Sequence, residues 1–362
     1  MFEHHRENRD RTFNFPTGGG EKHQSRDRQR LDPSTDQSYQ SRIRYIVMTA
    51  TTDKYSPLAS IGSTPLVRLK RVVPEGCADV FVKLEYFSPT GSYKDRMAMS
   101  VLERAEERGD LRPGMKVLEW TGGSTGIALA FACAVRGYPF HVVSADIVAA
   151  EKLRSMKIFG AELDLVISPD GRFGGQLVTM MIERAKAIKA SAPDTYYFVN
   201  QMENPDMPKG YESLGKELLE QVPGKIDAFC GCTGTSGMVV GTGRSLLAAD
   251  PLVRIIAFEP ATCAVLSGGT NGPHGVEGVA PGFVPPQFDR SIVKEARPVD
   301  EAEGRLMCSR LAKEEGLFAG TSTGLNVVGA ITLAKDLGPG HIVVTVACDT
   351  GLKYLTGDLY QK

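Results

Sequence analysis

From residue 49 to the end of the chain, short apolar segments typical of β-strands alternate with amphipathic segments typical of helices. Strands that alternate with helices form mainly parallel sheets, which helices cover on both faces. The pattern therefore predicts an α/β fold built from open, twisted, mainly parallel sheets. The strand-like segments are KVLEWT (116–121), FHVVSA (140–145), LDLVIS (163–168), DAFCGC (227–232), IIAFEP (255–260), GLFAG (316–320) and HIVVTVA (341–347).

Length and composition limit the classes of partner. The 362 residues are 42% hydrophobic and 23% charged, with a formal net charge of −1, which is ordinary for a globular protein. The near-zero charge gives no electrostatic reason to expect nucleic acid or an anionic membrane surface as a partner. No apolar run approaches the ~20 residues that a membrane-spanning helix needs. We therefore expect small-molecule partners, with no nucleic acid and no membrane.

The seven cysteines are scattered and contain no C-x-x-C pair. An odd, scattered set favours a reducing, cytoplasmic compartment over a disulfide framework. Because no cluster of histidine and cysteine has the spacing of metal ligands, we expect no metal site.

The chain divides into three parts by composition. Residues 1–48 are polar and lack apolar periodicity, so we expect a disordered leader, with Met48 as a hypothetical functional start. Residues 49–205 are expected to form an N-terminal α/β domain, whose first strands can pack on the second domain. Residues 206–362 are expected to form a C-terminal α/β domain, and the proline-containing segment 200–208 marks the crossing.

Glycine-rich turns follow several of the expected strands. They lie at residues 121–126, 233–237 and 320–324, and the loop SPTGSYKDR (88–96) is a fourth small-residue segment. In open parallel sheets, ligands bind beyond the carboxyl ends of the strands. The four segments together therefore predict one cleft.

The turn Gly234-Thr235-Ser236-Gly237, followed by Met238, has the features of a phosphate site. It offers free backbone N–H groups, two hydroxyls and a helix N-terminus. It lacks the Gly-Lys-Ser/Thr of a P-loop and the G-x-G-x-x-G spacing of a dinucleotide site, which favours a lone phosphate monoester. A plain tight turn before a helix is the alternative interpretation.

Two other turns carry hydroxyls at helix starts. Ser322 can exchange a hydrogen bond with a ligand, or it can simply cap a helix. The turn at 121–126 suits a carboxylate, because it presents N–H groups together with hydroxyls ahead of a helix; taken alone, it is also compatible with an ordinary turn.

Lys94 discriminates between these interpretations. We predict Ser92 as the N-cap of the following helix and Asp95 as its carboxylate partner, which places Lys94 in the first turn. A cation is disfavoured at the positive end of a helix dipole, so this position favours the neutral amine. Neutral lysine amines form Schiff bases. Combined with a lone-phosphate site, Lys94 indicates pyridoxal phosphate, with its aldehyde on Lys94 and its phosphate on residues 234–238.

The order of motifs resembles the fold-type II pyridoxal-phosphate enzymes, specifically the cysteine synthase and cystathionine β-synthase family. The resemblance runs from about Tyr55 to Tyr360. The matching segments are IGSTPLVRL (61–69), SPTGSYKDR (88–96), TGGSTGIALA (121–130), EKLRSMKIFGAEL (151–163), GTSGM (234–238), EPATCAVLSGG (259–269), GPHGVEGVAPGFVP (272–285), GLFAGTSTG (316–324) and VACDTGLKYL (346–355).

The resemblance implies two α/β domains with the cofactor cleft between them, and a role for each matching residue. Lys94 corresponds to the Schiff-base lysine. The other cofactor-binding residues implied are Ser124, Gly234, Thr235, Ser236, Gly237, Met238 and Ser322, with Ser322 facing the pyridine nitrogen. The substrate-binding residues implied are Thr121, Gly122, Gly123, Thr125 and Gln201.

The activity implied is β-replacement on an O-activated serine or a similar amino acid by way of an α-aminoacrylate, with sulfide or another nucleophile, in a homodimer. Net β-elimination, as in a cysteine desulfhydrase or a serine/threonine dehydratase, shares the early steps and stays open. A pyridoxal-phosphate-binding partner protein without turnover is a third alternative.

Four positions depart from the family pattern. Gly122 stands where the family has serine, Ser124 stands in place of an asparagine, Met238 stands in place of a threonine, and Tyr93 is unusual beside the lysine. These departures leave cofactor binding intact and point to a specialised choice of substrate.

Overall fold

The structure is a computed structural model that describes residues 53–171 and 174–361. The described residues belong to one compact unit of the chain, residues 37–362. The expected leader, residues 1–48, and the hypothetical start at Met48 lie outside the described residues.

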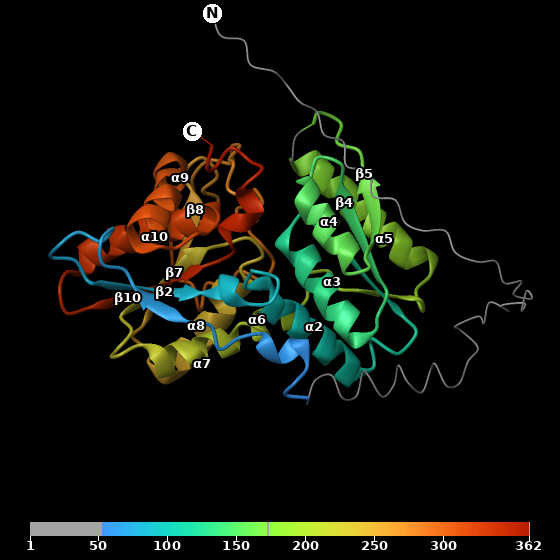
Figure 1. The fold of residues 1–362 in the computed structure, drawn as a ribbon, viewed down its shortest axis with the longest axis horizontal. Coiled ribbons are helices and arrows are strands. Elements are labelled where there is room, and N and C mark those ends of the chain that lie inside the picture. The colour runs from blue at the N-terminus through green and yellow to red at the C-terminus, as the bar shows by residue number, and fades with distance from the viewer. Residues whose placement is uncertain (1–52, 172–173, 362) are drawn as a thin grey trace, which may run out of the picture. The chain divides into compact units, whose positions relative to one another are not determined.

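The smaller sheet has four parallel strands in the order β5-β4-β3-β6. Helix α5 packs on one face of this sheet, while α3 and α4 pack on the other (Figure 1). The strands are β3 (Lys116–Trp120), β4 (Phe140–Ala145), β5 (Glu162–Val166) and β6 (Tyr196–Phe198). The helices are α3 (Ser124–Arg136), α4 (Ala150–Ile158) and α5 (Gly175–Ser191).

The larger sheet has six strands in the order β1-β2-β10-β7-β8-β9, of which only β1 runs antiparallel to its neighbour. Its strands are β1 (Leu66–Arg68), β2 (Asp79–Leu84), β7 (Ala228–Cys232), β8 (Arg254–Pro260), β9 (Glu295–Val299) and β10 (Ile342–Ala347). The helices that follow or precede them are α2 (Lys94–Arg108), α6 (Asp206–Lys209), α7 (Glu212–Gln221), α8 (Gly237–Ala249), α9 (Glu301–Arg310) and α10 (Thr321–Leu337). Short single-turn helices are η1 (Pro57–Ser60), η2 (Glu85–Phe87), η3 (Leu311–Glu315) and η4 (Gly351–Tyr354).

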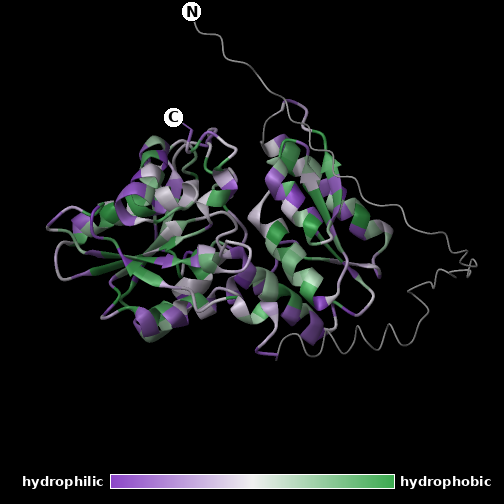
Figure 2. Ribbon diagram, in the orientation of Figure 1, coloured by the Kyte–Doolittle hydropathy of each residue, from purple (hydrophilic) through white to green (hydrophobic). Residues whose placement is uncertain are grey.

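Two mainly parallel sheets with helices on their faces confirm the predicted α/β fold class. Figure 2 shows hydrophobic residues along the strands and hydrophilic residues on the outer sides of many helices, as a layered α/β core requires. Strands β1 and β2 precede α2 in sequence, yet β2 pairs with β10 near the end of the chain. The division into domains at residue 205 stays a prediction.

One predicted strand was wrong. Residues 316–320 (GLFAG) form no strand, and only Ala319 makes an isolated bridge, to Thr350. Both edges of β10 are already paired, with β2 and with β7, so this segment finds no open strand edge there. It begins at Gly316, which ends η3 in the left-handed conformation (φ 71°).

The largest buried cluster contains side chains from both sheets and from the helices between them. It includes Val117 and Val142 of the small sheet, and Phe229 and Val344 of the large sheet. Helix α2 contributes an apolar stripe at helical spacing to this cluster: Met97, Val101, Leu102 and Ala105 are all fully buried. The two sheets therefore share one core, and α2 is a central helix within it.

The start of α2 is fixed by a buried cluster of charges. The Arg96 guanidinium donates to both carboxylate oxygens of Glu85 (2.6 and 2.8 Å) and to both oxygens of Glu217 (2.7 and 2.8 Å). Lys83 adds a second cation 2.7 Å from Glu217. Burial opposes ionisation of Glu217, but its bonds with Arg96 and Lys83 outweigh burial and lower its pKa to about 2. The cluster joins β2, η2, α2 and α7.

Glu85→Gln should destabilise the protein by about 3 kcal/mol, because it leaves the buried Arg96 without one of its two counter-charges. Urea unfolding, followed by far-ultraviolet circular dichroism, measures this change. Glu75→Gln is the matched control, since Glu75 is exposed, and it should shift stability by less than about 0.5 kcal/mol. Equal effects of the two substitutions would show that the charge cluster does not stabilise the fold.

Candidate cofactor and substrate site

The loops singled out in the sequence follow the carboxyl ends of strands in both sheets. Residues 121–123 connect β3 to α3, and residues 233–236 connect β7 to α8. The end of β10 lies beside the start of α10, because the Cys348 N–H donates to the Thr323 hydroxyl (3.0 Å). This is the edge at which parallel α/β sheets bind ligands.

Lys94 is the first residue of α2, and its side chain is buried. The Ser92 hydroxyl accepts the Lys94 N–H (3.2 Å), but the residue that precedes the helix is Tyr93, so the predicted N-cap is one residue early. The Asp95 carboxylate is not the predicted partner of Ser92; it accepts hydrogen bonds from the backbone N–H and the hydroxyl of Thr90. Asp95 therefore holds the SPTGS loop closed in front of the lysine.

The amine of Lys94 lies in an apolar environment. Burial lowers its pKa to about 8, while Cys348 and Asp349 act in the opposite direction. The sequence predicted a neutral amine from the helix dipole; in the structure, burial lowers the pKa of the amine. Nζ lies 3.1 Å from the hydroxyl of Tyr93, a residue that the sequence marked only as unusual.

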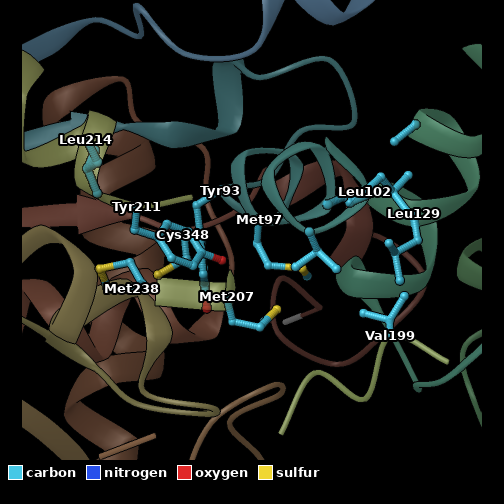
Figure 3. Packing of buried hydrophobic residues seen from close by; sticks show 14 of the residues in the cluster. Tyr93, Met97, Leu102, Leu129, Val199, Met207, Tyr211, Leu214, Met238 and Cys348 are labelled. Atoms are coloured by element: carbon cyan, nitrogen blue, oxygen red, sulfur yellow. The ribbon is translucent and has the colours of Figure 1, made fainter. Parts of the chain in front are cut away.

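The Gly234–Met238 turn has a cradle-like geometry. Ser236 adopts a left-handed conformation (φ 68°) immediately before α8, which is uncommon for a non-glycine residue and is typical of functional turns. Its hydroxyl is buried without a hydrogen-bond partner. A Cβ on Gly234 would lie 2.3 Å from the Gly278 carbonyl oxygen, so only glycine fits. The Met238 side chain points into the core (Figure 3), so Met238 can contribute only its backbone N–H group to the turn.

Ser322 lies in the first turn of α10, next to the end of β10. Burial raises the pKa of the Cys348 thiol to about 12, and the nearby Ser322 hydroxyl acts in the opposite direction. The Tyr93 N–H donates to the Cys348 carbonyl (3.0 Å). Cys348 therefore connects the segment that carries Lys94 to the segment that carries Ser322.

The segment Thr121–Thr125 starts α3, and Gln201 packs against it. The Thr125 hydroxyl donates to Gln201 Oε1 (2.9 Å), and Gln201 Nε2 donates to the Trp120 carbonyl (3.2 Å). Thr121 accepts the Gly123 N–H through its hydroxyl (3.3 Å). The predicted substrate residues Thr121, Gly122, Gly123, Thr125 and Gln201 are thus neighbours in the fold.

Glu119 is a buried carboxyl that the sequence reasoning missed. It accepts the N–H groups of Trp120 (2.8 Å) and Gln201 (3.0 Å), and so it fixes the loop before Gln201 against β3. Burial raises its pKa to about 8, and these two hydrogen bonds only partly offset burial. Its place in a strand, among apolar residues, is the sequence signal that could have identified it.

Asp349 and Lys353 were also missed. Ser124 donates to Asp349 Oδ2 (3.4 Å) and accepts from Lys353 Nζ (3.3 Å). Tyr354 donates a further bond to Asp349 (2.9 Å). Burial raises the pKa of Asp349, and Lys353 acts in the opposite direction. A carboxylate directly after a parallel strand was the available signal, because ligand sites form at strand ends.

The residues present fit a phosphorylated pyridine aldehyde. Ser236 offers an unused hydroxyl beside the N–H groups that begin α8, which have no intrahelical acceptors and suit a phosphate. Lys94 offers a buried amine with a depressed pKa, as imine formation requires.

Within residues 53–171 and 174–361, no cluster of histidine, cysteine or carboxylate side chains could hold a metal ion. Within the same ranges, no helix is long and apolar enough to traverse a lipid bilayer.

Comparison with known proteins identifies the family. The model of the pyridoxal-phosphate dependent enzyme family matches residues 58–349. Among curated relatives, a cysteine synthase of Staphylococcus aureus (strain N315) is 41% identical over 302 residues, which cover 83% of this chain and 95% of that protein. An O-ureido-L-serine synthase of Streptomyces lavendulae is 38% identical over 307 residues, covering 84% of this chain and 92% of that protein.

A solved structure agrees with these relatives. O-acetyl serine sulfhydrylase isoform 3 from Entamoeba histolytica superimposes with a TM-score of 0.80 at 33% identity, over 85% of this chain and 92% of that chain. Three findings agree: the family model matches most of the chain, the relatives match over nearly their full length, and the fold is similar. The chain therefore belongs to the pyridoxal-phosphate dependent enzymes, within the group that contains the cysteine synthases.

Proposed function

We propose that this enzyme catalyses β-replacement on an O-activated L-serine, with sulfide or a related small nucleophile as the second substrate. The observation that carries the proposal is the buried Lys94 amine, with its pKa of about 8, near Asp349, whose carboxylate is hydrogen-bonded to Ser124. The relatives named cysteine synthase and O-ureido-L-serine synthase support this reaction class.

When bound, the cofactor would accept electron density from the substrate's α-carbon, which makes the α-proton easier to remove. In this proposal, the backbone of Gly234–Met238 and the Ser236 hydroxyl hold the phosphate. Ser322 faces the pyridine nitrogen as a hydroxyl, which does not force a proton onto it. Ser124 lies beside the ring hydroxyl.

The chain's own residues then carry out the proton transfers. Thr121, Gly122, Gly123 and Thr125 hold the substrate carboxylate at the N-terminus of α3, and Gln201 orients Thr125 through their hydrogen bond. The Lys94 amine takes the α-proton, and the Cβ–O bond breaks with its electron pair leaving on oxygen. The nucleophile adds to Cβ, and the proton held on Lys94 returns to Cα, which restores the amine.

Lys94→Ala should lower turnover by about 10³-fold or more, because the same amine forms the covalent link and serves as the base. Turnover of O-acetyl-L-serine with sulfide measures this loss. Borohydride reduction followed by peptide mapping should tag Lys94 in the wild-type enzyme. Lys216→Ala is the control, since Lys216 is exposed on α7. A tag on another lysine would refute the assignment.

Ser236→Ala should weaken cofactor binding by about tenfold, the cost of one hydrogen bond to a charged group. Ser236→Gly is the paired variant, because glycine adopts the left-handed conformation at this position without strain. Fluorescence titration of the cofactor-free protein with pyridoxal phosphate gives both dissociation constants. Normal binding by Ser236→Gly would show that the hydroxyl does not hold the phosphate.

Replacement and elimination are separated by the product. With O-acetyl-L-serine and either sulfide or a hydroxylated urea, we expect the substituted amino acid to account for the substrate consumed, with pyruvate as a minor product. Chromatography of the amino acids and a coupled pyruvate assay, run on the same samples, give the ratio. Pyruvate formation that no nucleophile suppresses would contradict replacement and favour elimination.

We further propose a homodimer in the cytoplasm, with domain boundaries near residues 49 and 205. The family resemblance supports the dimer. The cysteines support a reducing compartment, since all seven are free thiols and only Cys77 is not buried. Light scattering coupled to size-exclusion chromatography tests the assembly.

A further inference from the structure

We propose that Tyr93 is a positioning residue for Lys94: its hydroxyl and ring hold the ε-nitrogen and stabilise the ammonium that forms when Lys94 takes the substrate's α-proton. This inference rests on the proposed function, and it adds a residue that the family resemblance does not supply. Tyr93 itself is one of the departures from the family pattern.

The contact between the two side chains is close and specific. Lys94 Nζ lies 3.1 Å from Tyr93 Oη, which is hydrogen-bond distance, and 4.4 Å from the centroid of the Tyr93 ring. An ammonium over an aromatic face is stabilised by the ring as well as by the hydroxyl. The phenol therefore offers a cation two contacts at once.

Tyr93 is held rigidly in this position. Its N–H donates to the Cys348 carbonyl (3.0 Å), and its ring packs against Tyr211 with centroids 5.6 Å apart. Figure 3 shows Tyr93 in a group of buried side chains with Tyr211, Met238 and Cys348. These contacts position the Tyr93 hydroxyl beside the longer and more flexible side chain of Lys94.

Of the titratable groups near Lys94, Tyr93 is the one placed to stabilise the Lys94 ammonium. The others are Cys232 on β7, Cys348 and Asp349 after β10, and Tyr211 before α7. Burial raises the pKa of Cys232, Cys348, Tyr211 and Tyr93, so these four groups stay neutral over the working range of the enzyme. Asp349 is the one carboxyl among the facing groups, and it is already bonded to Ser124 and Tyr354.

The proton transfer explains why this contact matters. The substrate's α C–H bond breaks, its electron pair remains with the substrate carbon, and the proton moves to Lys94 Nζ. A neutral amine thereby becomes an ammonium inside an apolar pocket, where an unpaired charge is costly. Hydrogen bonds to a charged group are stronger than those to a neutral one, so the Tyr93 hydroxyl favours the product of this step.

Tyr93→Phe should therefore lower the pKa of Lys94 by about one unit, which is about tenfold in proton affinity. The measurement uses the full chain with its cofactor removed. Competitive acetylation of lysines by acetic anhydride, across a pH series and followed by peptide mapping, gives the pKa of Lys94 directly. The reactivity midpoint of Lys94 should move to lower pH in Tyr93→Phe, because the ammonium has lost a partner.

Tyr211→Phe is the matched control. It removes a phenol hydroxyl at similar depth from the adjoining ring, and that hydroxyl has no hydrogen-bond partner among the described residues. In Tyr211→Phe, the pH midpoint of Lys94 acetylation should equal that of the wild type. An unchanged midpoint in Tyr93→Phe, or an equal shift in both variants, would overturn the proposal.

A second measurement removes any dependence on the folding of a variant. Incorporation of 3-fluorotyrosine in place of tyrosine weakens each phenol as an acceptor without changing its shape, and it should also shift Lys94 to lower pH. In the loaded enzyme, exchange of the α-proton of L-alanine with deuterated solvent should slow in Tyr93→Phe and not in Tyr211→Phe. A labelling shift in a protein without β-replacement activity would support the contact and count against the proposed function.

Discussion

The buried charge cluster around Arg96 is the interaction on which the site depends. Arg96 lies two residues after Lys94, and its guanidinium is bonded on two sides by Glu85 and Glu217. A buried cation with two carboxylate partners has few positions of low energy, because moving it would expose unpaired charge in the core. The cluster therefore fixes where α2 begins, and with it the position of the Lys94 backbone relative to β2 and α7.

From this fixed start, burial controls the chemistry of the site. Burial lowers the pKa of Lys94 and raises the pKa of Glu119 and of Cys348. Burial disfavours the ammonium form of Lys94, so more of its side chain is present as the neutral amine near neutral pH. Polar groups within this buried region are stabilised by local contacts. Ser124 is hydrogen-bonded to Asp349 and Lys353, and the Lys94 amine is hydrogen-bonded to Tyr93.

Much of the fold could be predicted from the sequence, because local patterns carried it. β3, β4, β7, β8 and β10 match predicted strands to within one residue at each end. The error at residues 316–320 arose because an apolar pattern shows strand character without showing whether a neighbouring strand edge is open. Ser92 and Asp95 were misassigned as a capping pair because Thr90, five residues before Asp95, competes for the carboxylate.

The sequence by itself determined the chemical nature of this protein: an α/β chain with a lysine at a helix start, a glycine-rich phosphate turn and a hydroxyl at Ser322. These features are local, since each depends on residues that are adjacent in the chain. Only the tertiary structure decided which groups surround Lys94. Tyr93, Cys348 and Asp349 meet there because β10 lies in the sheet beside β2, more than two hundred residues earlier in the chain. Burial and pairing over such separations depend on packing, which no local pattern encodes.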